Sequence, residues 1–172
     1  MHEIIAPAIE ELCVAFERGG YNPTPVIDLG VLVANADGTV DERERELLLE
    51  VFQALLETKV TAEVVDALVS ASVEVIKVAG AEARARLVAA ILTDCDAVDA
   101  GLRVAIAIAF ASEGLTEAER GVIDRVAGAA DVPKARVDEL VEEVRSYTDA
   151  AGGVESARRT LVPQLPTHLP KP

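Results

Sequence analysis

The feature that most constrains the fold of this chain is an internal repeat at an offset of 75 positions. The first copy, Val31–Glu44, reads VLVANADGTVDERE, and the second, Ile106–Glu119, reads IAIAFASEGLTEAE. The copies align without a gap, and apolar positions continue to coincide beyond them, as Leu48 does with Ile123. Two copies are too few for an open solenoid, so the repeat predicts one domain with internal two-fold character.

The hydrophobic spacing predicts an all-α fold. Apolar residues recur three and four positions apart along most of the chain, and no segment keeps a two-residue alternation. We therefore expect a single-domain bundle of about eight helices. They are expected over residues 3–18, 26–36, 62–79, 81–93 and 102–112, and after Asp41, Thr116 and Pro133. Segments 26–36 and 102–112 are apolar almost all round, which places them at the centre.

Two details of this bundle can be predicted further. The central segments carry one charge each, Asp28 and Arg103, at equivalent repeat positions. They could pair across the pseudo-two-fold or lie near helix ends in water. The helix over 62–79 is expected to bury its apolar residues: Val64, Val65, Leu68, Val69, Val75 and Ile76.

The domain is expected to span residues 1–152. Gly152 and Gly153 end the periodic part, and residues 154–161 have the pattern of a short helix. Four prolines within 163–172 then favour an extended chain over a packed one. Residues 153–172 are therefore predicted to be a short helix followed by a Pro-rich, flexible tail.

The charge balance limits the partners. The 172 residues contain 30 acids and 16 Lys and Arg, a net charge of −14. Nucleic acid and anionic lipid need clustered basic residues, so the expected partners are metal cations and proteins with basic surfaces. No apolar run is long enough for a membrane span, and the acidic start does not resemble a signal peptide. We expect a cytoplasmic protein, peripheral to a membrane at most through a complex.

Several enzyme classes are excluded by residue types. The two histidines, His2 and His168, lie near the termini, so no internal Ser-His-Asp, Cys-His or His-metal site can form. Cys13 and Cys95 are too few and too far apart for a zinc ribbon or a disulfide framework. Neither a P-loop nor a GxGxxG motif occurs. We expect no enzymatic activity.

The first copy of the repeat contains the candidate site. Asp37, Asp41 and Glu44 surround a turn at Gly38, which can adopt the left-handed conformation needed there. Oxygen ligands suit a hard cation, here Ca²⁺, Mg²⁺ or Mn²⁺. The turn is not an EF-hand loop, because Val33 stands where the first ligand belongs, so a site would be weak and partly hydrated. Asp41 and Glu44 are equally explained as a helix cap.

The second copy offers one further candidate, Glu119. It aligns with Glu44 and closes a Thr116-x-x-Glu119 capping box. Ser112 stands in place of Asp37, so the second loop lacks the first acid and the two halves are not expected to hold a symmetrical pair of sites.

The repeated ADGTVDERE stretch after an apolar helix resembles the TerB-like family, which includes the tellurite-resistance protein TerB and the N-terminal domain of the co-chaperone DjlA. The resemblance covers about residues 5–149. It implies an all-helical domain with two-fold character, and acids that bind divalent metal or basic partners, matched here by Asp37, Glu44 and Glu119. It also implies a link to tellurite and chemical stress and to complexes at the inner face of the membrane, with no established enzymatic activity.

The sequence thus favours a non-enzymatic, TerB-like binding module in a stress-response or signalling complex. Asp37, Asp41, Glu44 and Glu119 are the candidate site for a divalent cation or a basic partner. The alternative is a structural, adaptor-like interaction domain whose acids only cap helices.

Overall fold

A computed structural model describes residues 2–38, 40–55, 61–111 and 114–150 of the chain. These residues form helices and no strand, which confirms the predicted all-α class. The helices are α1 (His2–Gly19), α2 (Thr24–Ala34), α3 (Glu42–Leu55), α4 (Ala62–Ala79), α5 (Ala81–Asp94), α6 (Val98–Ala109), α7 (Glu117–Ala129) and α8 (Lys134–Ala150). The predicted tail, 153–172, lies outside the described residues. None of the described helices combines the length and apolar character needed to cross a membrane.

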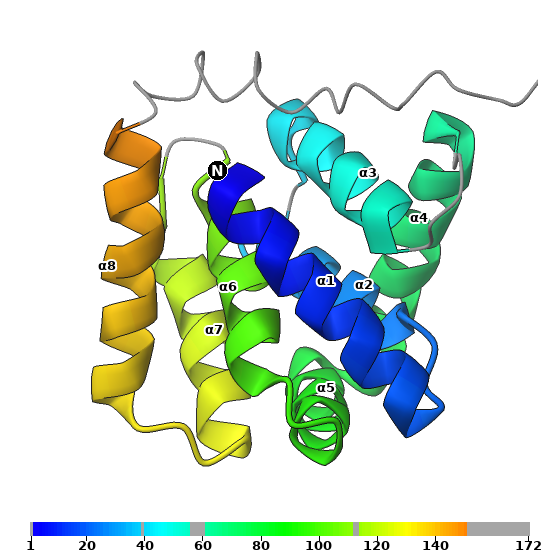
Figure 1. Ribbon diagram of the computed structural model, residues 1–172. Coiled ribbons are helices and arrows are strands. Elements are labelled where there is room, and N and C mark those ends of the chain that lie inside the picture. The colour runs from blue at the N-terminus through cyan, green and yellow to red at the C-terminus, as the bar shows by residue number, and fades with distance from the viewer. Residues whose placement is uncertain (1, 39, 56–60, 112–113, 151–172) are drawn as a thin grey trace, which may run out of the picture.

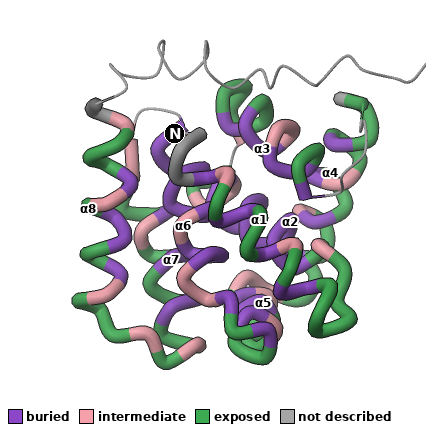
Figure 2. Tube along the Cα trace, viewed as in Figure 1, coloured by how far each residue is buried: buried purple, intermediate pink, exposed green. Residues whose placement is uncertain are grey.

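The two central helices are α2 and α6, as their apolar composition predicts. Every residue of α2 from Pro25 to Ala34 is buried, and so is α6 from Ala100 to Ala109 except for the half-buried Arg103. They pack against each other, with α3 and α4 on one side of the bundle and α7 and α8 on the other (Figure 1). Figure 2 shows the buried positions gathered along the faces that point into this core.

The remaining helices pack across the two halves of the chain. α1 packs mainly on α6, and α5 packs on α2, so the first helix of each repeat covers the central helix of the other. Likewise α2 contacts α4 as α6 contacts α8. This reciprocal exchange brings the two halves into one continuous aliphatic core.

Gly30 of α2 lets α3 and α6 approach closely, because glycine has no side chain. A Cβ atom there would lie 2.8 Å from Cδ2 of Leu48 and 3.0 Å from Cδ1 of Ile108. Those distances are shorter than ordinary van der Waals contact, so only glycine allows α3 and α6 to pack this tightly on α2.

The central charges do not pair with each other, so the suggested Asp28–Arg103 contact is wrong. Asp28 is buried and forms an ion pair with Arg84 of α5, and it accepts a hydrogen bond of 2.9 Å from the Ser72 hydroxyl of α4. Arg103 instead reaches α8, where its Nε lies 3.4 Å from Oε2 of Glu143. Each central charge is therefore neutralised by a helix that packs beside its own.

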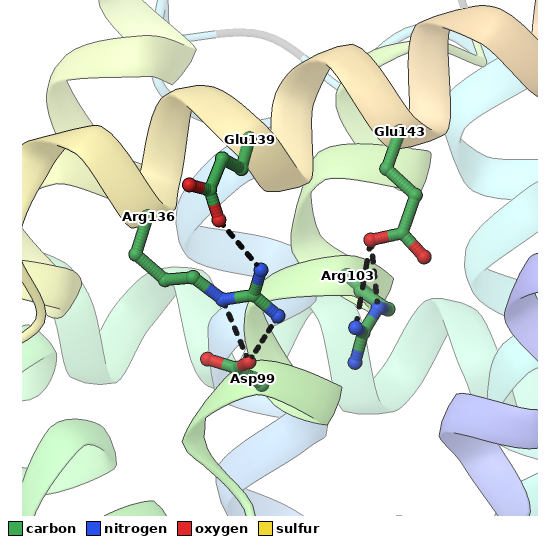
Figure 3. Close-up of polar contacts among 5 residues, drawn as sticks. All are labelled: Asp99, Arg103, Arg136, Glu139 and Glu143. Atoms are coloured by element: carbon green, nitrogen blue, oxygen red, sulfur yellow. Dashed lines mark hydrogen bonds and ion pairs between the residues drawn. The ribbon is translucent and has the colours of Figure 1, made fainter.

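A second polar contact joins α6 to α8, as Figure 3 shows beside the Arg103–Glu143 pair. Arg136 of α8 donates from Nε and Nη2 to the same oxygen of Asp99, at 3.0 and 2.7 Å. It also donates to Glu139 at 2.8 Å. The acidic start of α6 is thus tied to the first turn of α8.

The predicted core face of α4 is partly wrong. Val65, Val69 and Ile76 are buried, but Val64 and Val75 are 48% and 42% exposed. α4 lies at the edge of the bundle and packs on α2, α3 and α5 from one side only (Figure 1). The stripe of Val65, Val69 and Ile76 makes this contact, and the neighbouring stripe with Val64 and Val75 stays exposed to solvent.

Candidate functional site

The acidic turn between α2 and α3 has the backbone geometry that the sequence predicts. Gly38 has φ +96°, in the left-handed region, and its N–H donates to the carbonyl oxygen of Asn35 at 3.0 Å. A side chain other than glycine is strained in this conformation. The turn presents Asp37 on the surface.

The start of α3 is a reciprocal cap made by Asp41 and Glu44. Oδ1 of Asp41 accepts a hydrogen bond of 2.8 Å from the N–H of Glu44. Oε2 of Glu44 accepts one of 2.9 Å from the N–H of Asp41. Both residues therefore serve the capping role, which generally contributes about 0.5–2 kcal/mol.

The start of α7 repeats this arrangement with Thr116 and Glu119. The Thr116 hydroxyl oxygen accepts from the N–H of Glu119 at 3.2 Å. Oε2 of Glu119 accepts from both the N–H and the hydroxyl of Thr116, at 2.7 and 2.8 Å. The predicted capping box is confirmed.

Both capping glutamates are buried in the bundle. Glu44 is 7% exposed and Glu119 is 4% exposed. Each stands four positions before a fully buried residue, Leu48 or Ile123, so each lies on the core face of its helix. That spacing is visible in the sequence and could have indicated the burial.

The four predicted residues form one electrostatic cluster although the repeat separates them in sequence. The pKa of Glu44 is raised from 4.5 to about 7, chiefly because burial disfavours the charged carboxylate. The backbone hydrogen bond at Asp41 lowers this pKa, whereas the negative charges of Asp41, Glu119 and Asp37 raise it. The fold therefore gathers the acids of both copies around Glu44.

One oxygen of the cluster is unsatisfied. Oε1 of Glu119 is buried, and no donor in the described part of the chain reaches it, while Oε2 carries both cap bonds. A buried carboxylate oxygen without a donor is costly. Such an atom is an acceptor that a bound cation or an N–H donor of a partner could satisfy.

The carboxylates do not converge on a preformed metal cage. Among the described residues, no group of three or more His, Cys, Asp or Glu side chains is placed to hold a metal ion. The cap bonds direct one oxygen of Glu44 and one of Glu119 to the backbone, and Asp37 and Asp41 are exposed. Ser112 and its neighbour Glu113, in the second turn, lie outside the described residues. The arrangement therefore provides concentrated negative charge and one buried acceptor oxygen, Oε1 of Glu119, that no donor among the described residues reaches.

Comparison with known proteins identifies the family. No curated protein and no solved structure matches the chain. The family model described as tellurite resistance protein TerB matches residues 24–159, which includes both copies of the acidic motif and most of the chain. The chain therefore belongs to the TerB family.

Proposed function

We propose that this chain is a non-enzymatic binding module that acts in a tellurite- or chemical-stress response or in a signalling complex in the cytoplasm. Its ligand is a divalent cation or the basic surface of a protein partner, held at the acidic cluster of Asp37, Asp41, Glu44 and Glu119. Membership of the TerB family supports the stress-response role. The net charge of −14 supports a cationic ligand over an anionic one.

The observation that carries the proposal is the coupling of two buried glutamates from the two copies of the repeat. The charge of Glu119 raises the pKa of Glu44, so the two carboxylates repel each other in the free protein. A positive ligand would relieve this repulsion and occupy the orphaned Oε1 of Glu119. Binding would then link the two halves of the domain.

A cation bound at the acidic cluster would keep part of its hydration shell. Mg²⁺ and related hard cations keep several waters and use one or two carboxylates, so a preformed cage is not required. While the caps stay intact, Oε1 of Glu119 lacks a donor among the described residues, and the carboxylates of Asp37 and Asp41 lie exposed at the surface nearby. We expect weak affinity, of the order of 10⁻⁴–10⁻³ M.

Calorimetric titration of Ca²⁺, Mg²⁺ and Mn²⁺ into the metal-free full chain tests this proposal. Binding heat should be present in the wild type and lost in Asp37→Asn and Glu119→Gln. The matched control is Glu42→Gln, which removes an exposed acid from the same helix start and should bind like the wild type. If millimolar cation gives the wild type neither heat nor a higher melting temperature, the cation site is refuted.

The second candidate function is an adaptor-like interaction domain whose acids only cap helices. The hydrogen bonds of Glu44 to Asp41 and of Glu119 to Thr116 favour it. In that case Glu44→Gln and Glu119→Gln would change the melting temperature and leave cation titrations as flat as those of the wild type. Thermal unfolding with and without cation, measured on the same variants, separates the two functions.

A further inference from the structure

The charges that act most strongly on Glu44 within the acidic cluster are all negative. Asp41, Glu119 and Asp37 each raise its pKa through their charge. Glu119 is 4% exposed, and no donor in the described part of the chain reaches its Oε1. A buried carboxylate oxygen in this state is costly. A donor for it would come from a bound ligand or from a stretch of this chain outside the described residues.

The segment that follows α8 has the charge that the cluster lacks. Residues 151–172 contain Arg158, Arg159 and Lys171 against one acid, so they carry +2 while residues 1–150 carry −16. The two arginines are the only adjacent pair of basic residues in the sequence. A guanidinium presents five N–H donors in a planar fork that matches a carboxylate. The segment is therefore complementary to the cluster in charge and in hydrogen bonding.

The end of α8 brings this segment within reach of the cluster. α8 packs on α7, and an ion pair between Arg120 and Asp138 joins the two helices. From Asp138 to its end at Ala150, α8 rises about 18 Å, towards the side of the bundle at which α7 begins (Figure 1). Arg158 follows Ala150 by eight residues, which span up to about 26 Å when extended. That length is sufficient to return to the level of Glu119.

We propose that residues 151–172 dock in cis on the acidic cluster, with Arg158 and Arg159 as the groups that bind its carboxylates. This inference rests on the proposed function, because the segment occupies the site that a cation or a basic partner uses. The family match extends to residue 159 and so includes both arginines.

The docked segment acts as a built-in competitor. A tethered segment has an effective concentration in the millimolar range, so even weak ion pairs are populated. An added ligand binds only the fraction of molecules whose site is open, and its apparent Kd is the intrinsic Kd divided by that fraction. The ligand and the segment therefore exclude each other.

Paramagnetic relaxation measured by NMR tests the contact without any added ligand. A nitroxide is attached to the full chain at Ser156→Cys, in a Cys13→Ser background that removes the half-buried thiol and leaves only the buried Cys95. The amide signals of Glu44 and Glu119 should broaden. Signals at the end of α1, which lies on the opposite side of the bundle from the end of α8 (Figure 1), should stay sharp.

Replacing the arginines identifies the groups that make the contact. Arg158→Gln and Arg159→Gln should each reduce the broadening and together abolish it, with unchanged thermal unfolding. The matched control, Lys171→Gln, removes one charge from the same segment and should leave the broadening as it was. Sharp signals at the cluster in the parent chain overturn the proposal, as does an equal loss with Lys171→Gln. Broadening of an isotope-labelled chain by a spin-labelled second chain would assign the contact to another copy and overturn docking in cis.

Calorimetric titration of Ca²⁺ into the full chains without the nitroxide measures the competition. The double variant Arg158→Gln/Arg159→Gln should lower the apparent Kd about threefold or more, because its site stays open, and Lys171→Gln should not. An equal Kd in the double variant and the wild type would overturn the competition. Flat titrations in every chain would refute the cation site of the proposed function instead, and the broadening would still decide whether the segment docks.

Discussion

Replacing Glu44 with Gln should change how the stability of the protein depends on pH. In the folded chain the pKa of Glu44 is about 7, and its ordinary value is 4.5. Between these values the folded state binds more protons than the unfolded state, so the free energy of unfolding falls as pH rises through this window. Glutamine stays neutral at every pH and keeps an oxygen that can accept the hydrogen bond from the N–H of Asp41.

The magnitude follows from the pKa shift. One pKa unit corresponds to 1.36 kcal/mol, so a shift from 4.5 to about 7 sets an upper bound near 3 kcal/mol on the stability lost when Glu44 ionises. Relaxation of the exposed neighbours Asp37 and Asp41 and screening by salt reduce this value. We expect Glu44→Gln to match the wild type at pH 4.5 and to exceed its stability by about 1–3 kcal/mol at pH 8.

Urea unfolding followed by circular dichroism, at pH values from 4.5 to 8, measures this difference. The other acids contribute their own pH dependence to both proteins, so the informative quantity is the difference in free energy between variant and wild type at each pH. Glu42→Gln, at an exposed position in the same helical turn, should give a flat difference.

A flat difference curve for Glu44→Gln would refute the raised pKa that burial and the neighbouring acids give Glu44. So would a variant that is less stable than the wild type at pH 8. Either result would mean that water or a positive group outside the contacts given above stabilises the charged carboxylate of Glu44.

Three further predictions concern the core and the cluster. Asp28→Ala should lower the free energy of unfolding by about 3–5 kcal/mol in urea titration, because it leaves the partner guanidinium uncompensated; a loss below 1 kcal/mol would mean that this ion pair is solvated. Gly30→Ala should destabilise by about 1–3 kcal/mol through overpacking, whereas Gly121→Ala, with open space around it in α7, should stabilise by about 0.5–1 kcal/mol in the same assay. Glu119→Gln should lower the pKa of Glu44, measured by NMR titration of its carboxyl carbon, and an unchanged value would show that the two groups are not coupled.

Much of the local structure could be predicted from residue types and spacing. The helix expected over 62–79 coincides with α4, and the capping pairs at Asp41 and Thr116 start α3 and α7 as expected. α6 begins at Val98, earlier than the predicted start at 102, and its first turn contains Asp99. The charge of Asp99 is held by Arg136 of α8. Residues distant in sequence supply that contact, so no local pattern reveals it.

The candidate site could be predicted in its residues but not in its surroundings. The repeat identified Glu44 and Glu119 as equivalent, and both are where a cap requires them. Their burial and mutual repulsion arise only when the two halves pack together. The free oxygen of Glu119 likewise depends on which donors the tertiary structure brings near it.

The sequence by itself determined the fold class, the central position of α2 and α6, and the capped acidic helix starts. These depend on helical periodicity, on apolar content and on hydrogen bonds three residues apart. The tertiary structure alone decided that Asp28 pairs with Arg84, and that α4 buries one apolar stripe and exposes the next. Periodicity shows that a helix has an apolar face, but which part of that face is covered depends on the neighbours that the whole fold supplies.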